Sequence, residues 1–408
     1  MAENGPSGSA EQEGVLTRPT QAVILAGGRG TRLAPLTDSM PKPMVPFHGR
    51  PFLAYLIEHL REQGFTRVLL LLGYRAQQIQ DYFTDGQQFG VQIDYSVTPE
   101  EDETGTRVRK ARALLDPIFL LMYGDNYWPM PFAAMWDRFK RHDVAAMLTV
   151  YGNQDGFSRD NIQLDADGMI RLYDKSRTAE GLKGVDLGFM ILCKEVVDLL
   201  ADGNISFEAT LYPQLAKRGQ LLAFITEHRY YSITSPGKLP VMEQFLARRP
   251  AVLLDRDGVL NRKMPRAHYV CSWQDWQWLP GALSALRRLQ VAGYRVIVVT
   301  NQAGVARGAM SEADLQAIHA RMQQEVEAAG GKIDAIYTCP HGWDEGCACR
   351  KPKPGMLLQA QRDFHLDLSR VWYVGDDERD GLAADAAGCR FAMVTEHSSL
   401  EQVLDTIL

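Results

Sequence analysis

Two aspartates in the C-terminal half stand at a spacing that phosphoryl chemistry uses. Asp255 and Asp257 directly follow the apolar run AVLL at residues 251–254. On a loop after a buried strand, two carboxylates this close can converge on one Mg²⁺ and one phosphorus atom. One can act as a nucleophile while the other donates and accepts the proton. The pair therefore indicates phosphate-ester chemistry.

Further polar residues end other apolar runs of the same half. Thr300 and Asn301 end the run IVVTN, and their small donor groups suit phosphoryl oxygens. Lys351 follows Arg350 and supplies positive charge. A third apolar run, VWYVG, is followed by the carboxylates Asp376, Asp377 and Asp380. Because the carboxyl ends of parallel strands meet at one edge of a sheet, these sets predict a single site.

The N-terminal half carries a different phosphate-binding pattern. The apolar run AVILA ends in the loop GGRGTR at residues 27–32. Glycines let backbone N–H groups approach a phosphate, and Arg29 and Arg32 add cationic donors. The loop matches neither GxGxxG followed by a helix nor GxxxxGK[ST], which disfavours a dinucleotide fold and a P-loop NTPase. Lys42, held between two prolines, and Asp125, after an apolar run, complete this candidate site.

A compact group of thiols and one imidazole points to a metal. Its members are Cys339, His341, Cys347 and Cys349. This ligand set matches tetrahedral zinc, and because all four positions are filled by protein the site should be structural. The loop should then collapse without the metal. The remaining cysteines are isolated and are interpreted as unpaired thiols without a role: Cys193, Cys271 and Cys389.

Strands and helices of two sheets are needed to position these residues. From residue 21, apolar runs alternate with segments of helical spacing such as FLAYLIEHLREQG. The alternation restarts at residue 251, after the proline-bracketed helix PGKLPVMEQFLARRP. The chain is therefore predicted to be α/β, with two tandem three-layer αβα domains. The expected division is a disordered tail at 1–19, a first domain at 20–236, a linker helix at 237–250 and a second domain at 251–408.

Composition limits the classes of function. The 408 residues are 46% hydrophobic and 23% charged, which suffices for large cores. The net charge of −6 disfavours a nucleic-acid partner, whereas local basic pockets can still bind small anionic substrates. No apolar run approaches the ~20 residues of a membrane span, and the N-terminus lacks the pattern of a secretory signal. We expect a cytoplasmic protein with neither a membrane nor a nucleic acid as partner; the sequence leaves the oligomeric state open.

The N-terminal motifs together resemble one family. LAGGRGTRLAPLT followed by PKPMVPFHGRPFLAYLIEHL is similar to the sugar-1-phosphate nucleotidyltransferases, from about residue 21 to about residue 242. The resemblance implies a Rossmann-like fold and a reaction of NTP with sugar 1-phosphate that gives NDP-sugar and pyrophosphate. The loop residues that would cradle the nucleotide phosphates are Gly27, Gly28, Arg29, Gly30, Thr31 and Arg32. Lys42 and Arg32 would neutralise the reacting phosphates, and Asp125 would hold Mg²⁺. Lys175 would face the sugar phosphate, and Asp186 the sugar.

Two stretches depart from that family's pattern. Many relatives carry a glycine-rich GTGGA-like stretch where this chain reads ETGTR at residues 103–107, which leaves Gly105 as a substrate-binding candidate. Many also carry an acidic metal ligand where Ser232 stands here. A hydroxyl is a weak, neutral ligand for Mg²⁺. Metal binding would then rest on Asp125, the phosphates and water, or this half would be altered in rate or specificity.

The C-terminal motifs resemble the haloacid-dehalogenase phosphatase superfamily over the whole segment. The resemblance implies that Asp255 forms an aspartyl-phosphate and that Asp257 is the general acid and base. Thr300 would bind the phosphoryl group and Lys351 would stabilise the transition state. The implied Mg²⁺ ligands are Asp255, Asp257 and Asp376, with Asp380 as a brace. A carboxylate beside Mg²⁺ and lysine is expected to stay ionised at neutral pH without tuning of its pKa.

Two longer motifs narrow this resemblance. CPHGWDEGCACRKPKPGM and TNQAGVARG are similar to the D,D-heptose 1,7-bisphosphate phosphatases, and the zinc-bearing histidinol-phosphate phosphatases are the alternative. Arg350 would clasp the second phosphate bidentately. Arg307 and residues 266–269 would border the sugar. Further substrate-binding candidates are Asn301, Gln302 and Asp377.

The two implied reactions are chemically consecutive. Removal of the 7-phosphate leaves heptose 1-phosphate, which a nucleotidyltransferase consumes. We therefore expect a bifunctional enzyme of nucleotide-activated heptose biosynthesis, with small-molecule substrates, Mg²⁺ at both sites and structural Zn²⁺. KPMVPFHGRPFL resembles heptose 1-phosphate guanylyltransferases, which implies GTP as the nucleotide donor. The alternatives are an N-terminal half that binds a sugar nucleotide without catalysis or uses another nucleotide, and a C-terminal half that hydrolyses another small phosphate ester.

Overall fold

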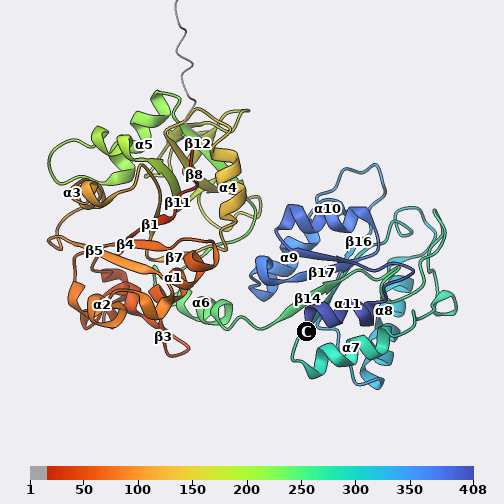
Figure 1. Cartoon of the computed structure of the whole chain (residues 1–408). Helices are drawn as coiled ribbons and strands as arrows, with labels where there is room; N and C mark the ends of the chain where they lie inside the picture. The colour runs from red at the N-terminus through yellow and green to blue at the C-terminus, as the bar shows by residue number, and fades with distance from the viewer. Residues whose placement is uncertain (1–15) are drawn as a thin grey trace, which may run out of the picture.

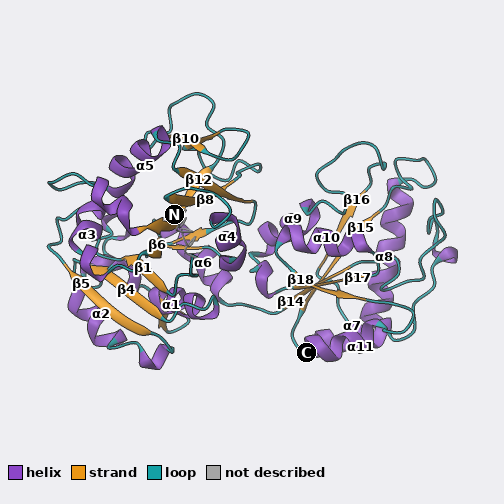
Figure 2. Cartoon of the chain, turned by 45° about the horizontal axis from the view of Figure 1, so that its top comes forward, coloured by secondary structure: helices purple, strands orange, loops and turns teal. Residues whose placement is uncertain are grey.

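The computed structural model describes residues 16–408, which form two bodies joined by one connection (Figure 1). Each body contains its own sheet with helices on both faces, which confirms the prediction of two αβα units (Figure 2). Residues 1–15 of the predicted disordered tail lie outside the described residues. The end of that predicted tail is anchored, because Arg18 donates a hydrogen bond of 2.8 Å to the carbonyl oxygen of Gln63 and lies over the Phe132 ring.

The first sheet has seven strands of mainly apolar residues. In spatial order they are β12 (Leu221–Thr226), β8 (Ala146–Tyr151), β11 (Val185–Cys193), β6 (Ile118–Tyr123), β1 (Gln21–Leu25), β4 (Arg67–Leu72) and β5 (Gln92–Val97). All neighbours are parallel except β11, which runs antiparallel to β6 and β8. Such continuous apolar runs are typical of strands covered on both faces.

Helices cover both faces of this sheet. α1 (Phe52–Glu62), α2 (Ala76–Phe83), α4 (Phe132–Phe139) and α6 (Leu239–Leu246) share one core, and α3 (Thr104–Lys110) and α5 (Phe207–Lys217) share the other. Successive residues of β1 alternate between the two cores, Ala22 and Ile24 in the first and Val23 and Leu25 in the second. Three two-stranded pieces complete the body: β2 (Pro46–Phe47) with β3 (Arg50–Pro51), β7 (Asn126–Tyr127) with β13 (Tyr231–Ser232), and β9 (Ile162–Leu164) with β10 (Ile170–Tyr173).

The helix predicted between the two domains is shorter than the sequence suggests. α6 ends at Leu246, and Arg248 adopts a left-handed conformation with φ 48°. The left-handed Arg248 cannot continue a right-handed helix, and Pro250 disfavours helical backbone at the residue before it. Met242 and Phe245 of α6 are buried in the first core, so the helix packs as part of the first body.

The second sheet has five parallel strands. Their spatial order is β16 (Ala335–Cys339), β15 (Arg295–Asn301), β14 (Ala251–Leu254), β17 (Trp372–Gly375) and β18 (Arg390–Met393). α7 (Ala282–Val291), α8 (Glu312–Ala328) and α11 (Leu400–Ile407) lie over one core, and α9 (Gly355–Phe364) and α10 (Glu378–Ala387) over the other. A reciprocal capping box between Asp377 and Asp380 starts α10.

The two bodies contact each other through buried polar pairs. Gln361 of α9 is fully buried and donates a hydrogen bond of 2.8 Å to the Tyr231 hydroxyl. The backbone amide of Leu368 donates to Nε2 of His228 over 3.2 Å. Both contacts provide hydrogen-bond partners for polar groups that are buried at the junction. Separating the bodies would therefore leave these groups without their partners.

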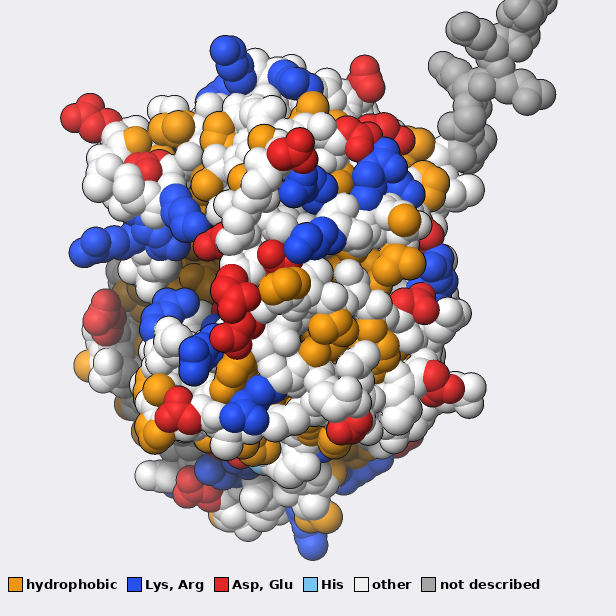
Figure 3. All heavy atoms as spheres, turned by 90° about the vertical axis from the view of Figure 1, so that its left-hand side faces the viewer, with side chains coloured by type: hydrophobic (Ala, Val, Ile, Leu, Met, Phe, Trp, Pro, Cys, Tyr) orange, Lys and Arg blue, Asp and Glu red, His pale blue; other side chains and the backbone are white. Residues whose placement is uncertain are grey.

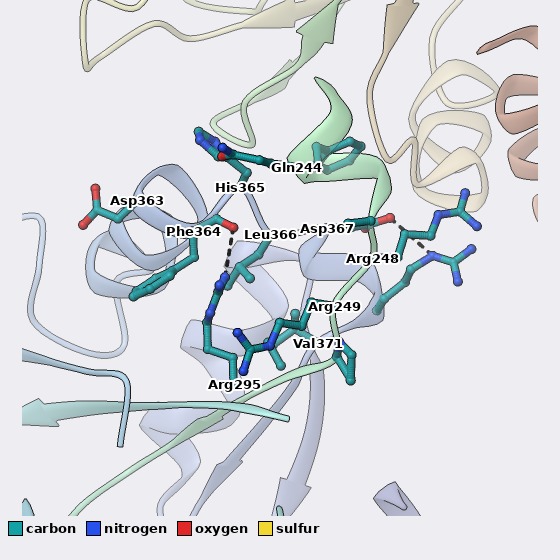
Figure 4. A pocket seen from close by; sticks show the side chains of 15 residues that line it. Gln244, Arg248, Arg249, Arg295, Asp363, Phe364, His365, Leu366, Asp367 and Val371 are labelled. Carbon is teal, nitrogen blue, oxygen red and sulfur yellow. Dashed lines mark hydrogen bonds and ion pairs between the residues drawn. The ribbon is translucent and has the colours of Figure 1, made fainter. Parts of the chain in front are cut away.

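A cavity of about 310 Å³ lies at this junction (Figure 4). In it Arg295 donates a hydrogen bond of 3.3 Å to the Phe364 carbonyl oxygen, and Arg370 lies 3.4 Å from Asp367. Arg295 begins β15, whereas the chemistry-bearing Asn301 ends it, about 20 Å away at 3.3 Å per residue. The junction cavity is therefore separate from the site that the sequence predicts in the second body.

Charged side chains on the first body are mixed in sign. On the face shown in Figure 3, Lys and Arg side chains are interspersed with Asp and Glu. In the part of the chain that the structure describes, no helix combines the length and apolar character that crossing a membrane requires.

Candidate active sites

The ends of two neighbouring strands bring the predicted acidic residues of the second body together. Asp255 follows β14, and Asp376 and Asp380 follow β17. Carboxylate oxygens of these three residues all lie within 4.8 Å of one another. The predicted meeting of Asp255 with Asp376 is therefore observed, and Asp380 joins them at the base of the cluster.

Lys351 lies at the centre of this cluster. It is 4% exposed, and its Nζ lies 2.9 Å from Asp255 Oδ1 and 2.7 Å from Asp380 Oδ1. It also donates a hydrogen bond of 2.8 Å to the Tyr373 hydroxyl, which in turn donates to Asp380. Tyr373 is a site residue that the sequence did not reveal, because within VWYVG it has the pattern of a core aromatic residue.

Asp255 lies in surroundings that shift the pKa of its carboxyl group in both directions. Burial raises its pKa, while the Lys351 ammonium lowers it and the neighbouring Asp380 and Asp257 raise it further. The expectation of an ionised carboxylate concerns Asp255 beside bound Mg²⁺ and stays a prediction. What the structure adds is the opposing effect of desolvation, which the sequence could not show.

Asp257 has the opposite environment. Burial raises its pKa, but the adjacent Arg256 guanidinium and hydrogen bonds from Asn261 (2.8 Å) and Gln302 (2.7 Å) outweigh burial and lower the pKa. Gln302 also donates to Thr300 Oγ1 over 2.9 Å. Gln302, predicted to bind substrate, therefore holds two of the predicted catalytic residues in place. Arg256 is fully buried and was not recognised from the sequence.

The acidic cluster fits an oxygen-binding cation. Asp376 Oδ1 is buried without a hydrogen-bond partner, and Oδ2 of the same carboxylate lies 2.7 Å from Lys263 Nζ. An unpartnered carboxylate oxygen beside two other carboxylates is a suitable donor set for Mg²⁺. Lys263 is a further residue that the sequence did not single out.

A cavity of about 530 Å³ opens next to Asp257. Its basic residues are Arg256, Lys263, Arg266, Arg350 and Arg379, and it includes Asn301 and residues 266–269 as expected. Arg307 is not among the lining residues but lies 4.6 Å from the centroid of the Trp343 ring, which does line the cavity. Asp377 also lines it, although its carboxylate is paired with Arg379 over 2.8 Å.

The four predicted zinc ligands are gathered at one point. Cys339 and Cys349 Sγ lie 3.5 and 3.2 Å from His341 Nδ1, and Cys347 Sγ lies 3.7 and 3.5 Å from the other two sulfurs. Tetrahedral ligands 2.0–2.3 Å from one zinc ion would be separated by about 3.3–3.8 Å. Geometry and donor chemistry both fit zinc.

In the first body, the glycine–arginine loop borders a cavity of about 390 Å³. The loop residues that line it are Gly27, Gly28, Gly30, Thr31 and Arg32. Lys42 Nζ lies 2.5 Å from Asp125 Oδ2 on the same cavity. Gly30 has φ 69°, and a Cβ atom there would come within 2.8 Å of Lys42, so both backbone conformation and space require glycine. Arg29 lies beside the cavity over the Tyr74 ring.

Other predicted residues lie outside that cavity lining. The Gly105 amide donates to the Ile205 carbonyl over 2.9 Å, and its neighbour Thr104 lines the cavity, so substrate binding by Gly105 stays a prediction. Lys175 Nζ lies 3.5 Å from Ser206 Oγ. Asp186 is half-buried, and burial raises its pKa to about 7 while the Gly188 amide lowers it.

Ser232, which stands where many relatives carry an acidic metal ligand, forms a hydrogen bond with a lysine. Its Oγ accepts a hydrogen bond of 2.9 Å from Lys238 Nζ. The backbone amide of the next residue, Ile233, donates to the Asp125 carbonyl over 3.0 Å, which places Ser232 beside Asp125. This corner of the site therefore holds one carboxylate with several cations.

Two family models match the chain. The model for nucleotidyl transferases matches residues 21–215, and a HAD-hydrolase-like model matches residues 348–406. Among solved structures, D,D-heptose 1.7-bisphosphate phosphatase from B. bronchiseptica, complexed with magnesium and phosphate, is 39% identical with a TM-score of 0.36, covering 39% of this chain and 97% of that one. HddC from Yersinia pseudotuberculosis is 25% identical with a TM-score of 0.49, covering 56% of this chain and 100% of that one.

Two curated relatives match the second body. The D-glycero-beta-D-manno-heptose-1,7-bisphosphate 7-phosphatase of Pseudomonas aeruginosa is 44% identical over 146 residues, which are 36% of this chain and 81% of the relative. The protein of the same name from Bordetella bronchiseptica is 48% identical over 138 residues, 34% of this chain and 76% of the relative. With identity above two fifths over at least three quarters of both relatives, the chain belongs to the D-glycero-beta-D-manno-heptose-1,7-bisphosphate 7-phosphatase family.

Proposed function

We propose that the chain is a bifunctional enzyme that makes a nucleotide-activated heptose. It removes the 7-phosphate of D-glycero-D-manno-heptose 1,7-bisphosphate and then transfers a nucleotidyl group to the resulting heptose 1-phosphate. The observation that carries this proposal is the cluster of Asp255, Lys351 and Asp376 in a chain of that phosphatase family. The nucleotidyl transferase match on the same chain supplies the second reaction.

In the phosphatase site, the carboxylate of Asp255 attacks phosphorus and forms an aspartyl-phosphate as the bond to the sugar oxygen breaks. Asp257 donates a proton to that oxygen and then takes one from the water that hydrolyses the intermediate. Because its neighbours lower its pKa in the free site, the negative charge of the bound phosphate must raise that pKa before the transfer. Lys351 and Thr300 stabilise the negative charge on the phosphoryl oxygens. Mg²⁺, when bound at the carboxylates of Asp255 and Asp376, supplies further charge neutralisation.

The basic cavity beside Asp257 supports a substrate that carries a second phosphate. Lys263, Arg266 and Arg350 present cationic groups around a volume of about 530 Å³, next to the general acid Asp257. A substrate with one phosphate at Asp255 would direct its sugar and second phosphate into this cavity. Asn301 and Arg307 would border the sugar.

In the transferase site, a phosphate oxygen of heptose 1-phosphate attacks the α-phosphorus of the NTP, and pyrophosphate leaves. The loop at residues 27–32 would bind the phosphates, with Arg32 and Lys42 neutralising charge and Asp125 available to Mg²⁺. Lys175 and Asp186 would bind the sugar phosphate and the sugar. GTP is the proposed donor, on the basis of the resemblance of KPMVPFHGRPFL to guanylyltransferases.

Zinc at the Cys₃His group would hold residues 339–349 in place. The six cysteines are all free, which suits a reducing cytoplasmic compartment, and we place the enzyme there. The domain division at residues 236 and 250 remains part of the proposal, with α6 packed on the first body.

A substrate panel tests the proposal. Phosphate release is measured with heptose 1,7-bisphosphate, histidinol phosphate and simple phosphate esters, and pyrophosphate release with heptose 1-phosphate and each NTP. The proposal expects preference for the bisphosphate and release with GTP. A preference for histidinol phosphate would reject the heptose assignment. Absence of pyrophosphate with every NTP would favour a non-catalytic sugar-nucleotide-binding module, which the Ser232–Lys238 contact makes the second candidate.

A further inference from the structure

The first body contains a buried cation without an ion-pair partner. Arg107 of α3 is 3% exposed, and within residues 16–408 no carboxylate forms an ion pair with it. Its guanidinium lies against the cavity bordered by the glycine–arginine loop. Since a buried charge is costly unless it is paired or fully hydrogen-bonded, its surroundings need an explanation.

Carbonyl and hydroxyl oxygens from three neighbouring strand ends satisfy this guanidinium. Nη1 donates to the Leu72 carbonyl at the end of β4 (2.7 Å) and to Thr98 Oγ1 after β5 (2.5 Å). Nη2 donates to the carbonyls of Pro99 (3.0 Å) and Glu100 (3.1 Å) and, more weakly, Gly27 (3.4 Å). One side chain thus joins the ends of β1, β4 and β5 at the cavity.

Two glycines make room for this side chain. A Cβ atom on Gly27 would come within 2.6 Å of the Arg107 guanidinium, and one on Gly73 within 2.5 Å. Neither glycine has a positive φ, so the close approach, and not the backbone conformation, is what a larger residue would disturb. The guanidinium cannot simply move aside, because several hydrogen bonds fix it.

The charge of Arg107 is only distantly compensated. Burial lowers its pKa, while the carboxylates of Asp102, Glu101 and Glu103 raise it without forming an ion pair. The cavity beside it is lined by Arg32 and Lys42 and also by five carboxylates, Glu100, Glu101, Asp102, Glu103 and Asp125, of which Asp125 pairs with Lys42. A phosphate chain bound at the glycine–arginine loop would place negative charge beside a guanidinium that has no ion-pair partner among residues 16–408.

We propose that Arg107 is a positioning residue for the nucleotide: it fixes the loop that starts at Gly27 to the ends of β4 and β5, and its buried charge favours the polyphosphate. This inference rests on the proposed transferase function. It gives a specific role to the departure from the GTGGA-like pattern, because a buried and hydrogen-bonded arginine stands in this stretch.

Equilibrium binding of GTP with Mg²⁺, measured by calorimetry without sugar, tests the proposal. Arg107→Ala is expected to weaken binding about tenfold or more, and Arg107→Lys to recover only part of the loss because lysine cannot reach all acceptors. Arg109→Ala is the matched control: it lies two residues on in α3 and pairs with Asp202, so it should bind like the wild type. Phosphatase activity and thermal unfolding of each variant report whether the chain is folded.

A double-mutant cycle separates positioning from general damage. Gly73→Ala should weaken GTP binding in the wild type, because its methyl group displaces the guanidinium, and should have almost no further effect in Arg107→Ala. Equal binding by Arg107→Ala and the wild type, or an undiminished Gly73→Ala effect in the Arg107→Ala background, would overturn the inference. If the wild type binds no NTP at all, the transferase assignment fails, and the inference fails with it.

Discussion

Replacement of Lys351 by methionine tests the arrangement of the phosphatase site most severely. The variant keeps the length of the side chain but leaves the carboxylates of Asp255 and Asp380 buried without their cation. Breaking a buried ion pair by removing one partner costs about 3–5 kcal/mol. Loss of the positive charge should also slow phosphate release by about 10²–10³-fold, as for other preorganised donors to a transition state.

Proton uptake should relieve part of that cost at low pH. Burial already raises the pKa of Asp255, and Lys351 is the group that opposes it, so the variant's pKa rises further above the ordinary value of about 3.9. A folded-state pKa above the unfolded-state value gives stability at low pH that is lost as the pH rises through the folded pKa. Lys351→Met should therefore be less destabilised at pH 5 than at pH 8.

Urea unfolding at the two pH values, with and without Mg²⁺, measures this effect. Lys332→Met is the control, because Lys332 forms an ion pair of 2.8 Å with Asp334 in which the lysine side chain is 52% exposed, although that of Asp334 is only 9% exposed. Solvent screening of the lysine should keep the contribution of this pair near about 1 kcal/mol, below that of a fully buried pair. If Lys351→Met lowers the free energy of unfolding no more than Lys332→Met does, or if phosphate release is unchanged, Lys351 is not the cation on which the acidic cluster depends.

The remaining predictions concern other parts of the molecule. Burial lowers the pKa of His59 to about 4, so the unfolded chain takes up a proton at a higher pH than the folded chain does. The free energy of unfolding should therefore fall by about 3 kcal/mol in total between pH 6.5 and pH 4. Urea midpoints at pH 7 and pH 5 test this, and His59→Gln should reduce the dependence of the midpoint on pH. Cys347→Ser should lower the zinc content and the thermal stability of the second body; an unchanged stoichiometry in elemental analysis would contradict the ligand set. Gln361→Ala removes the hydrogen bond to the Tyr231 hydroxyl at the junction and should lower the stability of the contact between the bodies by about 1–3 kcal/mol. Limited proteolysis between the bodies should then be faster. Cleavage at the wild-type rate would argue against a fixed junction.

The fold and the strand-end clusters could be predicted from the sequence because they rest on local patterns. Apolar runs such as AVLL and VWYVG specify buried parallel strands, and the residues directly after each run must lie at the carboxyl edge of the sheet. The proximity of Asp255 to Asp376, and the gathering of the zinc ligands, follow from that rule and from short spacing.

Residues whose role depends on packing across the sheet could not be predicted in this way. Tyr373 has the periodicity of a core residue, and only the structure shows its hydroxyl between Lys351 and Asp380. Nothing in the ETGTR stretch indicates that Arg107 is buried against three strand ends, which only the structure shows. Gly105 was carried over from a family pattern, which could not show that its amide is already bonded to the Ile205 carbonyl.

The presence of two consecutive reaction centres on one chain can be measured in a single reaction. The protein is incubated with heptose 1,7-bisphosphate, GTP and Mg²⁺, and the products are followed by mass spectrometry. We expect a GDP-heptose together with equal amounts of phosphate and pyrophosphate. We also expect Asp255→Asn to form the nucleotide sugar from heptose 1-phosphate but not from the bisphosphate. Formation of nucleotide sugar from the bisphosphate by Asp255→Asn, or release of phosphate by the wild type with no nucleotide sugar from any NTP, would contradict the proposed coupling of the two sites.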